Sequence, residues 1–277
     1  MTNSVQEARQ ALGARLREIR RNADITAREL AAREGWHESK VSRIEHGTNR
    51  PTNDVIRAYC RHCRADDQLP DLLATRNTID NAYMEYRRLL SAGVNRGQVL
   101  YSKLESKAKT IRNYDPQIIP GLLQTAGYAE SMLRSVIEFY RLPDDLDSGV
   151  SKRMERQQVL YKRDRRFHFI INEKSLYTTV GDNDVMIGQL DRLHSIIGMP
   201  RVTLGIVPLS AEAKVVLENF VMFDNKIVRV EGHTAELTIT QPREMALYGQ
   251  AFDILASQSV TGEGARQLIR KALETRT

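Results

Sequence analysis

The sequence predicts a mainly α protein in two parts, an N-terminal bundle of about five helices followed by an α+β domain with one small sheet. Up to about residue 75, apolar residues recur at helical spacing between glycine and proline stops. From residue 167 onward, short runs rich in β-branched and aromatic residues alternate with helical stretches. The length of 277 residues suits about two domains, and 41% apolar residues suffice for a core in each. We expect domains at residues 1–75 and 101–277, joined by a helical connector at 76–100.

The first two helices are predicted from apolar spacing and capping residues. Residues 11–22 carry an apolar stripe at spacings of four and three, formed by Leu12, Leu16 and Ile19. Thr26 and Glu29 form a capping box, which starts a second helix at Thr26 or Ala27. Gly35 ends that helix because glycine adopts the left-handed conformation without steric cost. The result is a tight turn between two short helices.

The third and fourth helices follow directly. Val41 and Ile44 face the core from a third helix that Gly47 ends. Pro51 blocks its continuation, and Thr52 caps a fourth helix with an apolar stripe of Val55, Ile56, Tyr59 and Cys60. Two helices joined by a short glycine turn have the layout of a DNA-reading helix-turn-helix.

Cys60 and Cys63 are the only cysteines of the chain. Zinc would need about four ligands, and no second pair stands at a matching spacing. A redox Cys-x-x-Cys would open a helix after a strand, and this context is also missing. Both cysteines lie on one face of the fourth helix, so a buried apolar role is expected. No metal or cofactor is expected anywhere in the chain.

The N-terminal pattern resembles the XRE family of lambda-repressor-like regulators. The residues that carry the resemblance are Leu16, Arg17, Arg20, Thr26, Glu29, Leu30, Ala31, Gly35, Ser39, Val41, Ser42, Arg43, Ile44, Glu45, Gly47 and Pro51. The resemblance implies that the helix near residues 37–46 lies in the DNA major groove, with Glu38, Ser39 and Arg43 at base edges. It also implies that Lys40 contacts a phosphate or a base, and that Arg20 and Glu45 form a structural salt bridge.

Two departures from the family pattern shift some of these roles. Ala27 stands where the family commonly has Gln, so Arg28 is expected to take over the phosphate contact. His37 stands where the family usually has Ser or Thr, and its capping is weaker. Asn49 and Arg50 follow Gly47 and are expected to bind phosphates, which sets register without reading sequence.

The residues that are expected to contact bases also have purely structural interpretations. Glu38 is favoured at a helix start by the helix dipole, and its charge is unwelcome beside phosphates. Arg43 could be a solvated surface arginine, although guanidinium can bond both acceptors of guanine. Trp36, the only tryptophan, is expected to cover the turn as an apolar side chain.

Helices and then strands are predicted in the second part. A stripe of Leu72, Leu73, Ile79, Tyr83, Tyr86 and Leu90 predicts a helical stretch, and residues 101–112 are also expected to be helical. Further helices are expected from Leu122 or Thr125, after Gly149, around 185–197, and near 242–257 and 263–275. Strands are predicted at 167–171, 202–207, 220–223 and 227–230, with a tight hairpin at Asp224-Asn225.

This second part resembles the DUF5753 domain of actinobacterial regulators, over about residues 101–273. The resemblance rests on the run from Ile119 to Thr125, followed by Tyr128, Ala129, Arg153, Arg156, Gln157, Glu173, Gln189, Leu190, Pro208, Phe220 and Glu231. It implies transcriptional control, with relatives described as antitoxin-like and often encoded beside a small DUF397-type protein. The domain could sense a small molecule, bind such a partner or supply dimer contacts.

Four charged residues are the candidates for an effector site in the second domain, namely Arg153, Arg156, Glu173 and Glu231. Their plain alternative is ordinary ion pairing. The basic run at 152–166 is explained first as a solvated face, with an acidic partner or flanking DNA as alternatives.

Composition and motifs favour a DNA-binding regulator over an enzyme. The chain has 41 Lys and Arg against 35 Asp and Glu, a net charge of +6 that favours polyanionic partners. It contains no phosphate-binding loop, nucleophile elbow or His-Glu-x-x-His zinc helix, so no catalytic residue is assigned. An enzyme activity assembled from distant residues stays an alternative.

We therefore expect a sequence-specific transcriptional regulator that binds double-stranded DNA as a homodimer, with activity modulated through the second domain. An antitoxin-like protein that acts mainly by binding a small partner protein is the alternative. The sequence shows no apolar run of membrane-spanning length and no signal peptide, so a cytoplasmic location without membrane contact is expected.

Overall fold

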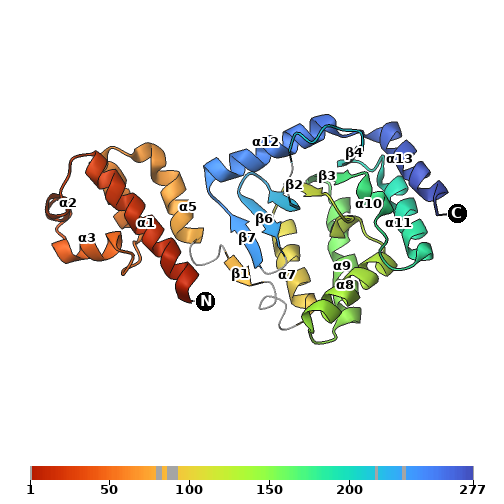
Figure 1. Cartoon of the computed structure of the whole chain (residues 1–277), viewed down its shortest axis with the longest axis horizontal. Coiled ribbons are helices and arrows are strands. Elements are labelled where there is room, and N and C mark those ends of the chain that lie inside the picture. The colour runs from red at the N-terminus through yellow and green to blue at the C-terminus, as the bar shows by residue number, and fades with distance from the viewer. Residues whose placement is uncertain (1, 79–82, 86–92, 216–217, 233–234, 277) are drawn as a thin grey trace. The chain divides into compact units, whose positions relative to one another are not determined.

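A computed structural model describes residues 2–78, 83–85, 93–215, 218–232 and 235–276 (Figure 1). The chain divides into two compact units. The first contains the residues up to Tyr83 together with Thr238–Ala246, and the second contains Met84–Leu237 and Leu247–Thr277. Each unit has its own buried apolar cluster.

The first unit is a helical bundle, as the sequence predicts. Its helices are α1 (Thr2–Asn22), α2 (Ala27–Arg33), α3 (Glu38–Glu45), α4 (Asn53–Cys63) and α5 (Leu69–Thr78), with a 3-10 turn, η1 (Asp66–Gln68), before α5. The first helix starts earlier than the apolar stripe at 11–22 indicated. The predicted stripe residues of α1, α3 and α4 are all buried in one core.

Turn residues separate these helices at the predicted positions. Gly35 and Gly47 have φ values of 64° and 69°, the left-handed region that favours glycine. Cys60 and Cys63 are buried free thiols in the core of the bundle, as expected. Burial raises the pKa of the Cys60 thiol to about 11, which keeps it protonated and unreactive.

The second unit is built on one mixed sheet with the strand order β1-β7-β6-β5-β2-β3-β4. The strands are β1 (Tyr83–Glu85), β2 (Thr110–Asp115), β3 (Arg166–Asn172), β4 (Val202–Val207), β5 (Phe220–Phe223), β6 (Ile227–Glu231) and β7 (Ala235–Ile239). The central strand β2 pairs in parallel with β3 and antiparallel with β5. Since β5 is also antiparallel to β6, strands β2 and β6 run in the same direction.

Helices cover both faces of this sheet. They are α7 (Val94–Glu105), α8 (Ala126–Tyr140), α9 (Leu146–Arg156), α10 (Lys174–Tyr177), α11 (Asn183–Ile196), α12 (Pro242–Gln258) and α13 (Gly262–Glu274), with 3-10 turns η2 (Gly121–Leu123) and η3 (Gln157–Tyr161). Phe252 of α12 packs against His168 and Phe220 on one face. Ile111 and Phe223 face the main core on the other, where α7 and α9 pack together (Figure 1).

The four predicted strands and the hairpin are confirmed. The strands appear as β3 to β6, and Asp224 follows β5 with φ 53°, in the left-handed region that a tight turn requires. The helices expected near 185–197, 242–257 and 263–275 are α11, α12 and α13. The helix expected beyond Gly149 is α9, but it starts before that glycine, at Leu146.

The prediction that residues 101–112 are helical is wrong at its end. Helix α7 stops at Glu105, and residues from Thr110 onward form β2. Arg165 ends the helix by donating hydrogen bonds to the carbonyl oxygens of Glu105, Ser106 and Ala108. A residue about sixty positions away in the chain therefore accommodates the carbonyl groups at the end of this helix.

The helical stripe from Leu72 to Leu90 is also corrected. Helix α5 covers Leu72 and Leu73, but Tyr83 lies in the short strand β1. The other stripe positions, Ile79, Tyr86 and Leu90, lie outside the described residues, as does most of the predicted connector at 76–100. Among the helices that the described residues form, none combines the length and apolar composition of a membrane span.

Candidate functional site

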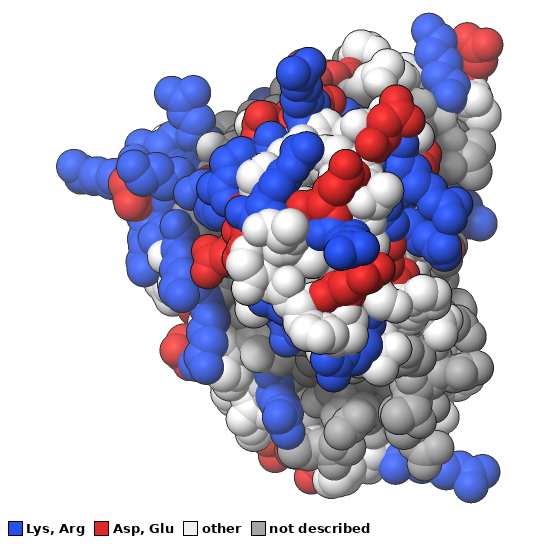
Figure 2. All heavy atoms as spheres, turned by 90° about the vertical axis from the view of Figure 1, so that its left-hand side faces the viewer, with Lys and Arg blue, Asp and Glu red and all other residues white. Residues whose placement is uncertain are grey.

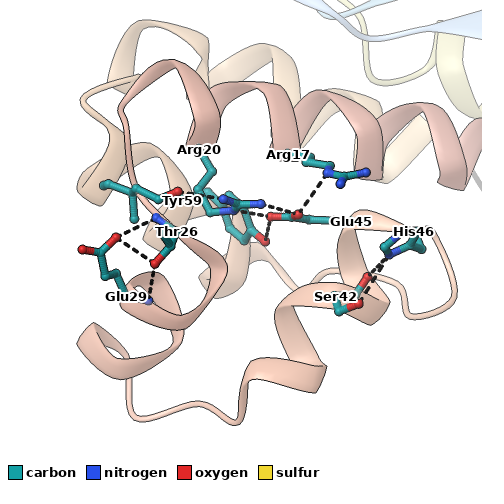
Figure 3. A network of polar contacts seen from close by, with 9 residues as sticks. Arg17, Arg20, Thr26, Glu29, Ser42, Glu45, His46 and Tyr59 are labelled. Atoms are coloured by element: carbon teal, nitrogen blue, oxygen red, sulfur yellow. Dashed lines mark hydrogen bonds and ion pairs between the residues drawn. The ribbon is translucent and has the colours of Figure 1, made fainter.

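A buried polar network fixes α3 on the first unit (Figure 3). The guanidinium of Arg20 donates from Nε and Nη2 to the two carboxylate oxygens of Glu45, at 2.6 and 2.7 Å. Its Nη1 donates to the carbonyl of Ile25 at 2.7 Å, and the Tyr59 hydroxyl donates to Glu45 at 3.1 Å. The structure thus contains the salt bridge between the first and third helices that the family resemblance implies. Glu45 belongs to the scaffold.

The charges of this network stabilise one another. The hydrogen bond to Glu45 raises the pKa of Arg20 above its ordinary value. Burial raises the pKa of Tyr59, with a further contribution from the charge of Glu45, so its hydroxyl stays protonated as a donor. Arg20 therefore stays charged and Tyr59 stays protonated, so both remain hydrogen-bond donors to Glu45.

Helix α2 starts with the predicted capping box. The Thr26 hydroxyl accepts a hydrogen bond from the Glu29 amide at 3.2 Å, and the Glu29 carboxylate accepts one from the Thr26 amide at 2.7 Å. These bonds lower the pKa of Glu29. Helix α3 starts at Glu38 after His37, whose Nδ1 accepts a hydrogen bond from the Ser39 amide at 3.3 Å. The imidazole therefore caps α3, the helix that is predicted to lie in the major groove.

The predicted base-reading residues share the outer side of α3. Glu38 and Arg43 are exposed, and Ser39 is partly exposed. Arg43 folds back along its own helix, with Nε donating to the Ser39 carbonyl and Nη2 to the Ser39 hydroxyl, both at 3.1 Å. The core-facing residues Val41 and Ile44 lie on the opposite side. Helix α3 therefore packs apolar side chains against the core and exposes polar side chains on its other side.

The remaining predicted contacts surround this helix. The ammonium of Lys40 lies over the ring of Trp36, 4.2 Å from its centroid. Trp36 packs against the core of the bundle, as its expected role as a cover requires. Arg28 is exposed in the first turn of α2, and Asn49 and Arg50 are exposed in the loop after α3. The amide of Asn49 donates to the Arg43 carbonyl at 3.0 Å, which ties this loop to the end of α3.

Sequence reasoning missed a polar pair near the end of α3. His46 caps the helix, and its Nδ1 lies 2.7 Å from the Ser42 carbonyl and 3.4 Å from the Ser42 hydroxyl (Figure 3). The spacing of four residues was the available signal. On the face shown in Figure 2, Lys and Arg side chains are spread with Asp and Glu between them.

The second unit contains a cavity of about 170 Å³. Three of the four predicted effector-site residues, Arg153, Arg156 and Glu231, line it. Glu173 is not among the lining residues. It directly follows β3, and its carboxylate accepts a hydrogen bond from the amide of Leu209 at 2.8 Å. The structure therefore brings together three of these four charged residues.

The cavity also has lining residues that sequence reasoning did not single out. Asp115 at the end of β2 is the main one, and it is only 7% exposed. Gln98 and Glu105 come from α7, where both accept hydrogen bonds from Arg156, and Gln124 accepts one from Arg153 at 2.7 Å. The period of α7 could have placed Gln98 and Glu105 on one face, seven residues apart. Asp115 carries no such signal, because the strand that it ends was not predicted.

Two family matches cover most of the chain. A family described as a helix-turn-helix domain matches residues 11–73, and one described as a domain of unknown function, DUF5753, matches residues 98–271. The chain belongs to the DUF5753 family. Both the predicted helix-turn-helix and the predicted DUF5753 domain are confirmed. No curated protein matches this DUF5753 protein.

Two solved structures show a weak likeness. NucT from Helicobacter pylori is 11% identical, and the match covers 65% of this chain and 97% of NucT at a TM-score of 0.36. The other structure is TrmBL2, described as an archaeal chromatin protein with a novel mode of DNA binding; it is 8% identical, with 65% and 52% covered and a TM-score of 0.31. Both scores are too low to carry an argument about this DUF5753 protein.

Proposed function

We propose that this protein is a sequence-specific, DNA-binding transcriptional regulator that reads the major groove with α3. The observation that carries the proposal is that buried residues anchor α3 in the bundle while other side chains of the same helix are exposed. Glu45 is buried and bonded to Arg20 and Tyr59, while Glu38 and Arg43 on the same helix are exposed. The helix lies in a chain with a matched helix-turn-helix domain, the kind of module that places its second helix in the groove.

Arg43 is the principal base reader in this proposal. Its guanidinium can donate to both the O6 and N7 acceptors of a guanine. In the free protein its Nε and Nη2 donate to the Ser39 carbonyl and hydroxyl, and these two bonds hold the side chain along the helix. Binding would exchange these intrahelical bonds for bonds to a base and free the Ser39 hydroxyl for a contact of its own.

Positively charged and amide side chains around α3 would hold the phosphates. These are Arg28, Lys40, Asn49 and Arg50, all at the ends of helices or in the loop after α3. Such contacts fix the register of the helix in the groove without reading sequence. Glu38 would then act by discrimination, since a carboxylate at a base edge accepts from cytosine and repels other acceptors.

We further propose that two copies bind DNA together. A single reading helix makes few base contacts, and two-fold pairing places two helices about one DNA turn apart, roughly 34 Å. Sedimentation of the full chain on its selected DNA tests this, together with footprinting. A single unpaired half-site occupied by a monomer would contradict it.

The second domain would control this activity without catalysing a reaction. The support is the cavity lined by charged and amide side chains, in a domain where no catalytic motif was found in the sequence. A ligand that changes DNA affinity without being converted is the expected behaviour.

The experiment for DNA reading starts from duplexes selected out of random-sequence DNA by the full chain. Fluorescence anisotropy then compares Arg43→Ala with Arg134→Ala, which removes the same charge from an exposed position on α8. We expect Arg43→Ala to lose about 1–3 kcal/mol on the selected duplex, roughly 5- to 150-fold in Kd, and to flatten preference at one base pair. The Arg134→Ala variant should bind as the parent does.

Two results would contradict the proposal. An equal loss on random duplexes would show that Arg43 contacts phosphate only. Failure to enrich any sequence over several rounds of selection would show that the protein does not read sequence.

A further inference from the structure

One edge of the sheet in the second unit carries many positive charges. Strands β2, β3 and β4 run parallel, so they begin at the same edge. The hairpin between β5 and β6 lies there too, because β5 is antiparallel to β2 and its last residue, Phe223, pairs with Ile111 near the start of β2. Six Lys and Arg residues occupy this edge and the turns that lead into it, here called the basic edge: Lys107, Lys109, Arg163, Arg166, Arg201 and Lys226.

The strand register brings three of these residues together from distant parts of the chain. Arg166 pairs with Thr110, and its amide donates to the Lys109 carbonyl at 2.9 Å. The Phe167 amide donates to the Arg201 carbonyl at 2.8 Å, which places Arg201 beside Arg166 on the next strand. Neighbouring strands lie about 4.8 Å apart, so Lys109, Arg166 and Arg201 follow one another along the edge at close to this spacing.

The turns that carry the other three residues are tied to the sheet. Asp224 accepts two backbone amides at the start of β2, both at 2.9 Å, and this joins the hairpin that contains Lys226 to that strand. The buried guanidinium of Arg165 donates to the carbonyl groups on both sides of Lys107. Arg163 lies two residues before Arg165 in the turn that leads into β3. The backbone of the basic edge is therefore fixed by the fold.

The positive charges of the basic edge are not neutralised by the described residues. All six side chains are exposed, and none of them has a hydrogen bond or ion pair with another described residue. The same segments contain two acidic residues, Asp164 and Asp224. Asp224 holds the backbone amides, and Asp164 lies 3.6 Å from the buried Arg165. Six cations therefore face solvent against two carboxylates that already have partners.

This arrangement does not help the domain to fold. Arg166 and Arg201 are like charges on neighbouring strands, and such pairs destabilise a sheet. A bound anion would remove this cost, because each phosphate between two guanidinium groups accepts hydrogen bonds from both. The repeated charge along the edge thus indicates a partner with repeated negative charge.

The composition of the basic edge favours a nucleic acid over a protein. The exposed residues between the cations are short and polar, namely Ser106, Thr110 and Asn225. Lys, Arg, Ser, Thr and Asn are side chains that contact phosphates in protein–DNA complexes. Protein–protein interfaces are instead depleted in Lys and centred on apolar and aromatic side chains. Of the large apolar side chains that are exposed in the described residues, only Tyr161 is close in sequence to these segments.

We propose that the basic edge binds phosphates of the duplex DNA that the first unit reads. The choice of duplex DNA among polyanions rests on the proposed function. These contacts read no sequence, so they add affinity and salt dependence without changing the preferred site. Because both units belong to one chain, the second contact forms at a high effective concentration once α3 is bound.

The test measures how DNA affinity depends on salt. Fluorescence anisotropy of the full chain uses duplexes of roughly 60 base pairs, one with the selected site and one of random sequence. The edge variant combines Lys109→Gln, Arg166→Gln and Arg201→Gln. Each lost phosphate contact lowers the slope of log K against log salt concentration by about 0.9, so the slope should fall by about 2.7. Between about 50 and 200 mM salt, the parent should then lose roughly 40-fold more affinity than the edge variant.

A matched control removes the same net charge from other parts of the second unit. It combines Arg134→Gln, Lys174→Gln and Lys271→Gln, which are exposed residues on α8, α10 and α13. Its slope should equal that of the parent. An edge variant with the slope of the parent, or a control variant that loses as much as the edge variant, would overturn the proposal.

The two duplexes separate this proposal from the proposed function. The edge variant should lose the same slope on both, whereas Arg43→Ala should lose affinity on the selected duplex alone. If no sequence can be selected, the random duplex still tests the basic edge. If the edge variant does not fold, Arg166→Gln and Arg201→Gln singly should each lower the slope by about 0.9. Unchanged DNA slopes together with weaker binding of polyglutamate would assign the edge to an acidic polypeptide and refute the proposal.

Discussion

Removing the Glu45 carboxylate is expected to destabilise the first unit severely. The side chains of Glu45 and Arg20 are only 3% and 9% exposed, so Glu45→Ala leaves a buried guanidinium without its counter-ion. Breaking a buried pair in this way costs about 3–5 kcal/mol. The Tyr59 hydroxyl also loses its acceptor, while Arg20 keeps its bond to the Ile25 carbonyl. We therefore expect a total loss of about 3–5 kcal/mol, a large part of the stability of a typical domain.

Urea unfolding followed by tryptophan fluorescence measures this loss. Trp36 is the only tryptophan and packs against the core of the first unit, so its emission reports that unit within the full chain. With a slope of about 1.5 kcal/mol per molar urea, the midpoint should fall by roughly 2–3 M. Glu18→Ala is the matched control, because Glu18 is exposed and pairs only with Arg15 one turn away on α1. Its cost should stay below about 1 kcal/mol.

A loss in Glu45→Ala no larger than in Glu18→Ala would refute the reasoning. A second comparison separates the loss of a partner from the value of the pair itself. Replacing all three polar groups, as Arg20→Met, Glu45→Leu and Tyr59→Phe together, removes the unpaired charge and should restore much of the stability. If the triple variant is as unstable as Glu45→Ala, the cost lies in packing and not in the isolated guanidinium.

Two further predictions follow, one from close packing around a glycine and one from the burial of Asp115. Gly13→Ala should destabilise the first unit, because its Cβ would lie 2.5 Å from the Ile44 carbonyl oxygen. Gly188→Ala on α11 is the control. Its Cβ would meet nothing within 4 Å, and the change should stabilise the second unit by about 1 kcal/mol. Thermal melts followed by Trp36 emission and by calorimetry check the pair, and a stabilising Gly13→Ala would contradict the close approach of α1 and α3. The folded pKa of Asp115 is about 6, above its ordinary 3.8, so the cost of its charge is present above pH 6 and is relieved as pH falls through 6 toward 4. Asp115→Asn should therefore raise the free energy of unfolding of the second unit by up to about 3 kcal/mol at pH 8, and by progressively less toward pH 4. Calorimetry measures this in the transition that Trp36 emission does not follow. An effect independent of pH would show that the charge of Asp115 is not destabilising.

The sequence predicted the first unit well because its signals are local. The capping box of Thr26 and Glu29, the left-handed glycines and the apolar stripes each involve residues within one or two helical turns. The salt bridge from Arg20 to Glu45 spans 25 positions, and only the family resemblance indicated it. The hydrogen bonds from the Arg43 side chain back to Ser39 were not predicted, because the rotamer of an exposed arginine depends on its surroundings in the folded protein.

The second unit was predicted less completely because its central strand depends on distant partners. Strand β2 pairs with β3 and β5, whose residues lie more than fifty positions away. A short strand beside a helix end gives a weak pattern on its own, and Arg165 sets the boundary between the two from across the chain. The strand β7 was missed as well. Its buried Glu236 interrupts the apolar alternation, and the Oε1 of its carboxylate accepts hydrogen bonds from Arg229 of β6 and from the Tyr101 hydroxyl.

The same limit explains which charged residues could be assigned to a site. On α3, Glu38 and Glu45 are the same residue type, and burial alone makes one an anchor and leaves the other at the surface. On α9, Arg156 is neutralised by Glu105, whereas Arg153 donates to neutral amides at the cavity wall. Sequence identifies the charges, but their roles depend on which partner the fold supplies. Asp115 shows this most clearly, because no residue near it in the sequence indicates that its carboxylate is buried beside a cavity. The cavity that it lines exists only once β2, β6 and the helices α7, α8 and α9 enclose a common space.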